Sequence, residues 1–324
     1  MPWTGAIYRI VMSISEHTLR IATRQSRLAL WQAEHVAALL RNKHPDLKVE
    51  LVPMTTQGDR ILDRSLASIG GKGLFIKELE LAMSEHRADI AVHSMKDVPS
   101  DMPPGFTLVA MLPRADPRDA FVSTHYKSFA SLPQGARVGT SSLRRQCQLK
   151  SVRPDLEIIT LRGNVDTRLR KLDENHYDAI ILAAAGLIRL GLESRITDYF
   201  TPEQSVPAVG QGIIGIECRD DDARNIAYVR ALNDTESWQC CVAERSFAQR
   251  LEGSCQSPIA GFATLNRDQL QLHGVIGSPD GSEMYRGSHI GTAADAQAIG
   301  IQLAAQLLKD GAGPLLDRLR QESP

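Results

Sequence analysis

Short apolar runs alternate with amphipathic segments through the first two-thirds of the chain, and this alternation restricts the fold more than any other feature. The runs have the length of strands, and the segments between them are helical in pattern. The expected strands cover residues 19–22, 49–52, 88–92, 106–112, 120–123, 138–139, 157–161 and 179–183, and the expected helices cover 28–43, 74–85, 143–152 and 165–173. This order predicts an α/β fold with mostly parallel sheets, whose ligand clefts lie at strand ends.

The pattern changes after Asp220. Asn233, with Glu236 three residues later, resembles a capping box and predicts a helix that ends near Leu251. Runs at 259–265, 269–276 and 283–290 predict a small meander, followed by a helix over 293–309. Proline-containing segments at 103–104, 114–117 and 201–207 are the expected boundaries, and the run 212–217 predicts one more strand. We therefore expect two α/β domains and a smaller α+β domain.

Composition limits the class of protein. A chain of 324 residues can form two or three domains with their own cores, and a net charge of −1 argues against a generally basic nucleic-acid binder. No apolar run reaches the ~18 residues that span a bilayer. Residues 1–11 lack the regions of a secretory signal, and Met12 is a candidate natural start. Five cysteines without a C-x-x-C pair predict neither disulfides nor a zinc site, and they favour a reduced, cytoplasmic compartment.

A carboxylate follows the expected strand at 88–92. The segment 93–99, HSMKDVP, places Ser94, Lys96 and Asp97 beyond the end of that strand, since Pro99 prevents its continuation. Ligands bind at this edge of open α/β sheets. Asp97 could therefore hold a proton or stabilise a developing cation, although a simple ion pair with Lys96 is an alternative.

Basic residues gather in one part of the sequence. Residues 137–171 contain nine Lys and Arg against three Asp and Glu. Three expected helix starts combine arginine with hydroxyl residues, at 23–26, 140–145 and 162–168. Helix N-termini bind anions, and arginine binds carboxylates bidentately. A polyanion site is therefore expected, with a solvated basic face as the alternative.

Two loops carry further candidate groups. Residues 70–73, GGKG, precede an expected helix and form an anion nest, a mobile lid carrying Lys72, or a plain flexible turn; they lack the spacing of a Walker loop. Cys255 lies in a Gly/Ser/Pro loop at 251–258, where a thiolate would be accessible for covalent attachment. A small core residue is the alternative for Cys255, and it is the interpretation we give Cys147, Cys218, Cys240 and Cys241.

Taken together, these segments closely resemble the porphobilinogen deaminase (hydroxymethylbilane synthase) family. The matching segments span the chain from about Leu19 in the family's order and spacing. They are residues 20–32, 70–80, 88–99, 139–149, 161–169, 207–218 and 251–259.

The resemblance implies a chemistry and its residues. The family carries a dipyrromethane cofactor, joined here to Cys255 by a thioether, and adds four porphobilinogen units to it with loss of ammonia. Hydrolysis then frees the linear tetrapyrrole hydroxymethylbilane. The implied catalytic residues are Asp97, Lys96 and Lys72; the implied cofactor-binding residues are Ser94, Arg24, Ser26, Thr140, Ser142, Arg144 and Arg145; the implied substrate-binding residues are Arg24, Arg162, Arg168 and Phe75.

The resemblance also implies the architecture. Two lobes like those of type II periplasmic binding proteins would be followed by a small C-terminal α+β domain. The expected domains are 18–112 with 213–231, 113–212, and 232–324, after a disordered extension at 1–17. The family implies a monomer whose partners are porphobilinogen and the growing polypyrrole, with no nucleic acid and no membrane.

Two residues depart from the family pattern. Ser68 stands where many relatives have a second lysine, which puts in doubt any role shared with Lys72. Arg27 stands where relatives commonly have proline, and it adds charge near the expected cleft.

Two rival functions account for part of the sequence. A two-lobed anion-binding protein explains the arginines but gives no reason for a cysteine in the 251–258 loop. An RNA-binding protein would use the basic stretch 137–171, which contains no aromatic residue to stack on bases. The sequence favours the enzyme over both.

Overall fold

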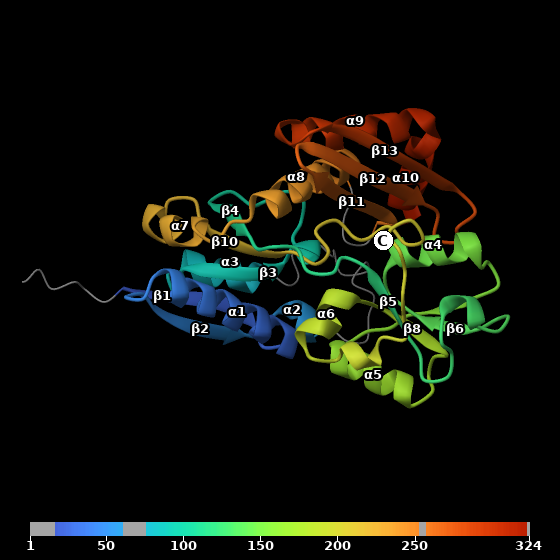
Figure 1. Ribbon diagram of the computed structural model, residues 1–324, viewed down its shortest axis with the longest axis horizontal. Coiled ribbons are helices and arrows are strands. Elements are labelled where there is room, and N and C mark those ends of the chain that lie inside the picture. The colour runs from blue at the N-terminus through green and yellow to red at the C-terminus, as the bar shows by residue number, and fades with distance from the viewer. Residues whose placement is uncertain (1–16, 61–75, 253–256, 323–324) are drawn as a thin grey trace, which may run out of the picture.

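The computed structural model describes residues 17–60, 76–252 and 257–322. Figure 1 shows three groups of elements, each built around one sheet. The second group is mainly green to yellow and the third is orange to red, whereas the first combines blue to teal elements with a strand and a helix from residues 214–230, which are gold to orange.

The first sheet has the strand order β2-β1-β3-β10-β4. Its strands are β1 (Thr18–Arg24), β2 (Lys48–Met54), β3 (Ile90–Ser94), β4 (Phe106–Met111) and β10 (Ile214–Arg219). Strand β1 runs parallel to β2 and β3, whereas β10 runs antiparallel to both β3 and β4. The chain therefore returns to this sheet after it has passed through the second one.

Helices cover both faces of the first sheet. Helix α1 (Arg27–Lys43) packs Val36 and Leu40 against Ile90 and its neighbours, and α3 (Lys77–Ser84) covers the other face. Strand β3 is buried on both faces, which explains the apolar run Ile90–Val92 at its start. Two short helices, α2 (Gln57–Arg60) and α7 (Ala223–Arg230), complete this lobe.

The second sheet has the strand order β7-β6-β8-β5-β9. Its strands are β5 (Asp119–Val122), β6 (Arg137–Gly139), β7 (Glu157–Ile159), β8 (Ala179–Ala183) and β9 (Asp198–Tyr199), with helices α4 (Leu143–Val152), α5 (Val165–Asp173) and α6 (Ala184–Arg189). Strand β6 runs parallel to β7 and β8, and β5 runs antiparallel to β8 and β9.

The third sheet is an antiparallel meander, β11-β12-β13. Its strands are β11 (Ile259–Asn266), β12 (Gln269–Gly277) and β13 (Met284–Thr292), and its helices are α8 (Thr235–Arg250), α9 (Ala296–Leu307) and α10 (Gly313–Glu322). Phe247 of α8 and Leu303 of α9 fill the core against this sheet. A Cβ on Gly274 would lie 2.6 Å from the Phe247 ring, so only glycine permits this close packing.

The expected fold class is confirmed: two α/β lobes precede a smaller α+β unit. The expectation of mostly parallel sheets is wrong, because half of the strand pairings in the first two sheets are antiparallel. The direction of β5 and β10 depends on the long connections before them, which strand patterns do not reveal. The domain boundaries given above stay a prediction.

Two local expectations are also corrected. Asp234, not Asn233, caps α8, because its side chain accepts a hydrogen bond from the Ser237 backbone N–H. The last expected helix is two helices: α9 ends at Leu307, and α10 begins at Gly313 after an irregular turn in which Gly311 has a φ of 115°. That positive φ interrupts the helix at a residue without a side chain.

Candidate active site

Asp97 lies in a short 3₁₀ helix, Met95–Asp97, that follows the last residue of β3. The buried Met95 side chain anchors this turn by packing closely against Gly215 of β10. A Cβ on Gly215 would lie 2.1 Å from the Met95 sulfur, so a larger residue there would displace Met95. Lys96 and Asp97, the next two residues of the turn, remain partly exposed. The expected placement of both groups at the strand end is confirmed.

A cavity opens beside Asp97 between β3 and α1. Its polar lining consists of Arg24, Ser26, Gln32, His93, Ser94 and Asp97. The Gln32 side chain donates a hydrogen bond of 2.8 Å to the Ser94 hydroxyl. Ser26 caps α1 by accepting a hydrogen bond from the Ala29 backbone N–H. Because Ser26 lines the cavity, the positive end of the α1 dipole lies beside it.

Cations from both lobes surround Asp97. Burial lowers the pKa of the Lys96 ammonium to about 8, with repulsion from Arg145 and Arg168 opposed by Asp97. Burial and Arg145 likewise lower the pKa of Arg168 to about 10, against the attraction of Asp97. Lys96 belongs to the first lobe and Arg168 to the second, so the two lobes share one charged site.

The three expected anion-binding helix starts differ in their contacts. At α5, the Arg168 guanidinium donates to the Gly163 carbonyl, and Asn164 caps the helix. Arg162, just before this helix, has a buried Nε without a hydrogen-bond partner among the described residues. At α1, Arg24 donates to the Asp59 carboxylate, with its Nε 3.1 Å from Oδ2.

The third helix start is occupied by an internal ion cluster. Arg144 and Arg145 of α4 are both buried, and both donate to the Asp119 carboxylate at 2.8–3.1 Å. Burial raises the pKa of Asp119, but the two guanidinium groups outweigh it and hold this pKa far below its usual value. Ser142 caps α4, and the Thr140 hydroxyl accepts from the Ser142 N–H. Cofactor binding by Thr140, Ser142, Arg144 and Arg145 stays a prediction. A cofactor bound there would meet two arginines that already pair with Asp119.

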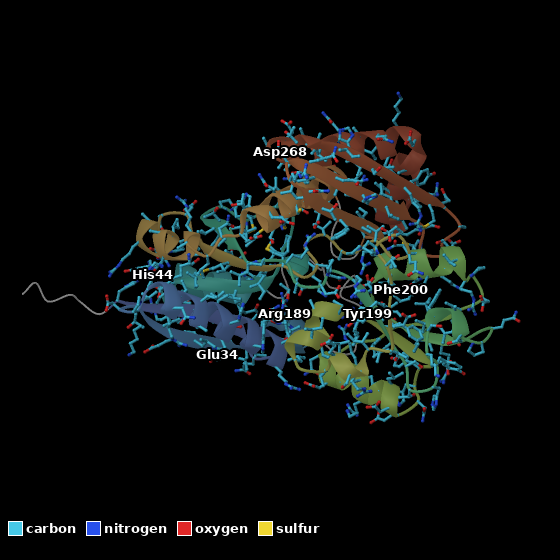
Figure 2. The ribbon with its side chains drawn as sticks, viewed as in Figure 1. Glu34, His44, Arg189, Tyr199, Phe200 and Asp268 are labelled. Carbon is cyan, nitrogen blue, oxygen red and sulfur yellow. The ribbon has the colours of Figure 1, made fainter. Side chains whose placement is uncertain are left out.

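A further arginine, missed in the sequence, joins the lobes. Arg189 lies at the end of α6, between the first and second sheets (Figure 2). Its guanidinium donates to the Gly212 carbonyl at 2.7 Å and lies 5.8 Å from the Trp31 ring of α1. Burial lowers the pKa of Arg189 to about 10.

The acidic partners were missed as well. Asp59 lies in the short helix α2, and Asp119 starts a buried strand; in both cases the partner arginine is 25 or more positions away. For Asp119, the signal in the sequence was a charged residue next to an apolar run, and that pattern does not indicate which residue pairs with it.

Three predicted residues lie outside the described residues: Lys72, Phe75 and Cys255. The other four cysteines are buried, which confirms their assignment to the core. Burial raises the pKa of Cys147 to about 11 and those of Cys240 and Cys241 to about 12. A thiol with so high a pKa is a poor nucleophile.

Two family models match most of the chain. Residues 19–227 match the family model described as the dipyromethane cofactor binding domain of porphobilinogen deaminase, and residues 238–309 match the one described as its C-terminal domain. The chain belongs to the porphobilinogen deaminase family. Membership of this family makes it a transferase of tetrapyrrole biosynthesis, and residues 19–227 match the domain described as binding the dipyrromethane cofactor.

Several solved structures are also similar. The methionine binding protein MetQ is 15% identical, with a TM-score of 0.45 over 68% of this chain and 90% of that chain. A nutrient binding protein from Burkholderia cenocepacia bound to methionine is 13% identical, with a TM-score of 0.42 over 65% and 89%. The periplasmic aliphatic sulphonate binding protein SsuA from Escherichia coli is 13% identical, with a TM-score of 0.40 over 74% and 71%.

The residues around the cavity fit an anionic cofactor. Burial lowers the pKa of Arg162, whose Nε lacks an acceptor among the described residues. Lys96 and Arg168 add two more cations around the Asp97 carboxylate. A ligand bearing several carboxylates would supply the missing negative charge.

Within the described ranges, no group of three or more His, Cys, Asp or Glu residues could hold a metal ion. None of the helices in these ranges is both long and apolar enough to cross a membrane.

Proposed function

We propose that this chain condenses four porphobilinogen molecules head-to-tail, with loss of ammonia, onto a dipyrromethane primer attached to Cys255. It then releases hydroxymethylbilane by hydrolysis. The observation that carries the proposal is the position of Asp97, whose carboxylate lines a polar cavity and interacts with cations from both lobes.

Asp97 would stabilise a developing positive charge on the substrate and accept a proton from it. When ammonia leaves the aminomethyl group of porphobilinogen, the C–N bond breaks and the remaining carbon becomes cationic. A carboxylate fixed at the end of β3 stabilises that charge as it develops, because it needs no reorganisation. The same oxygens can accept the proton lost from the attacked pyrrole carbon.

The cations would hold and orient the substrate. Every porphobilinogen unit brings two carboxylates, so a lengthening chain gathers negative charge. Arg24, Arg162, Arg168 and Lys96 surround the cavity side of Asp97 and would bind these groups, with Ser26 and Ser94 as further hydrogen-bonding positions. Lys72 and Phe75 are proposed to join them. When bound at Cys255, the dipyrromethane group supplies the pyrrole carbon onto which the first unit is added.

Further parts of the proposal concern the protein as a whole. We propose that it is a cytoplasmic monomer, with domains at 18–112 with 213–231, 113–212, and 232–324.

The mass of the purified protein tests the proposal directly. An excess of two condensed pyrrole units, absent from Cys255→Ala, is the expected result. If wild type carries only the polypeptide mass, it is incubated with porphobilinogen and the mass and the released ammonia are measured. A protein that neither gains mass nor releases ammonia would instead be a two-lobed anion binder, and the proposed reaction would be wrong.

A further inference from the structure

Behind the cavity lies a buried cluster of three titratable side chains from three elements. His93 of β3 and Glu217 of β10 meet with 2.7 Å between Nε2 and Oε2, and their side chains are 4% and 0% exposed. The strand register puts Gly215 opposite His93 and Glu217 opposite Ala91, so both side chains point toward α3. Helix α3 presents Glu80, the third member.

The two carboxyl groups of this cluster are suited to share a proton. Burial and the charge of Glu217 raise the pKa of Glu80 to about 7, although His93 and Lys77 oppose the shift. Glu217 Oε1 and Glu80 Oε1 are both buried, and neither has a hydrogen-bond partner among the described residues. A proton on one of these oxygens would supply the donor that both lack.

The cluster extends away from the reaction site. His93 lines the same cavity as Asp97, Glu217 is fully buried behind it, and Glu80 is only partly buried. The three side chains therefore lead from the cavity along the α3 face of the sheet to the partly exposed Glu80.

We propose that His93, Glu217 and Glu80 form a proton relay that carries protons away from Asp97 after each condensation. The inference rests on the proposed function, in which each new C–C bond releases one proton from a pyrrole carbon. That C–H bond breaks, its electron pair returns to the ring, and the proton passes through Asp97 to the His93 imidazole. The imidazole accepts this proton at Nδ1 and gives its Nε2 proton to Glu217, Glu217 passes a proton to Glu80, and Glu80 releases one to solvent. Glu217 and Glu80 thereby return to their starting state, and a ring flip returns the imidazole to its Nε2–H tautomer.

Glu80 has the properties of the last acceptor. A group exchanges protons most effectively when its pKa lies near the working pH. The charged groups that act on Glu80 are Glu217 of β10, His93 of β3 and Lys77 of α3 itself. Strands β1 and β10 also pack against α3, and their arginines have other partners: Arg20 pairs with Asp89, Arg24 pairs with Asp59, and Arg219 donates to the Met83 carbonyl. Glu217 and His93 are thus the members of the cluster that act on Glu80.

Glu80→Gln tests the relay, with Glu85→Gln as its matched control. Glu85 ends the same helix but is exposed and bonded to Arg87. In wild type and Glu85→Gln, the kcat of ammonia release should rise as the pH increases through about 7, because Glu80 can then accept a proton. Glu80→Gln should lose this rise and have a kcat at pH 8 about tenfold lower, with KM unchanged. His93→Gln should lower kcat similarly, its fold being checked by circular dichroism and Tm.

A second measurement is independent of turnover. In protein labelled with 13C at glutamate carboxyls, one carboxyl should titrate near pH 7 and be absent from Glu80→Gln. A wild-type pH profile in Glu80→Gln, or no glutamate titrating near 7, would overturn the relay. If wild type releases no ammonia at any pH, the proposed function is wrong, whereas the carboxyl titration still reports on Glu80.

Discussion

The side-chain amide of Gln32 donates a hydrogen bond of 2.8 Å to the Ser94 hydroxyl and thereby joins helix α1 to the last residue of β3. Ser94 immediately precedes the turn that carries Asp97. Gln32 is 3% exposed, so water does not replace this contact. The position of Asp97 thus depends on a polar contact made by a helix on the other wall of the cavity.

Gln32→Ala should therefore lower kcat by about tenfold to a hundredfold, because small misplacements of a reacting group are costly. Gln249→Ala is a suitable control, since its amide makes a similar bond of 2.7 Å to Asp101 at an exposed position. Steady-state assays of ammonia release with Tm measurements check this. Equal kcat values in the two variants would show that the Ser94 contact does not position Asp97.

Asp97→Ala should reduce turnover by at least a hundredfold and leave the fold intact, because the partly exposed side chain contributes little packing. Asp101→Ala, four residues later and exposed, should behave as wild type. Single-turnover assays and circular dichroism make the comparison. Near-normal turnover in Asp97→Ala would remove Asp97 from the chemistry.

Asp119→Asn should destabilise the protein by about 3–5 kcal/mol, since it leaves two buried guanidinium groups without their carboxylate. Asp155→Asn, which alters an ion pair at the edge of the same lobe, should have a small effect. Urea unfolding followed by fluorescence measures both. A loss below 1 kcal/mol would mean that Asp119 is not the centre of this cluster.

The same cluster predicts how stability responds to acid. Because the two arginines lower the pKa of folded Asp119 below its usual 3.8, its contribution is complete above that value and declines as the pH falls below it. Wild type should lose stability between about pH 4 and pH 2 more steeply than Asp119→Asn. Thermal unfolding across this range checks the sign, and parallel curves would contradict it.

Lys96 predicts a pH dependence of substrate binding. Its ammonium group, with a pKa of about 8, loses its charge as the pH rises from 7 to 9, so the KM for an anionic substrate should increase over this interval. Lys96→Arg keeps the charge and should give a flatter KM profile. Ionisation of the substrate affects both proteins equally, so only the difference between the two profiles counts. Identical profiles would exclude Lys96 from binding.

Local patterns predicted the elements that begin the anion-binding segments. Helix α4 spans Leu143–Val152 and α5 spans Val165–Asp173, as expected, because hydroxyl or amide caps and apolar spacing mark their ends within the sequence itself. The Ser94–Asp97 turn was likewise predictable, since a buried run and a proline enclose it.

Long-range relationships were not predictable. Arg144 and Arg145 looked like free anion-binding groups, but Asp119, 25 residues earlier, folds against them. His93 and Glu217 are 124 positions apart, and no pattern in either strand indicates that they meet. Such pairs are decided by strand order and direction, which depend on the complete chain.

The return of β10 to the first sheet has a consequence for synthesis on the ribosome. Strand β10 lies between β3 and β4, yet it follows every strand of the second sheet in the chain. When β4 emerges, the neighbour it will have in the native sheet has not been translated. The first lobe must therefore wait for the second, and a nascent chain that stops before residue 214 leaves both β3 and β4 with an open edge.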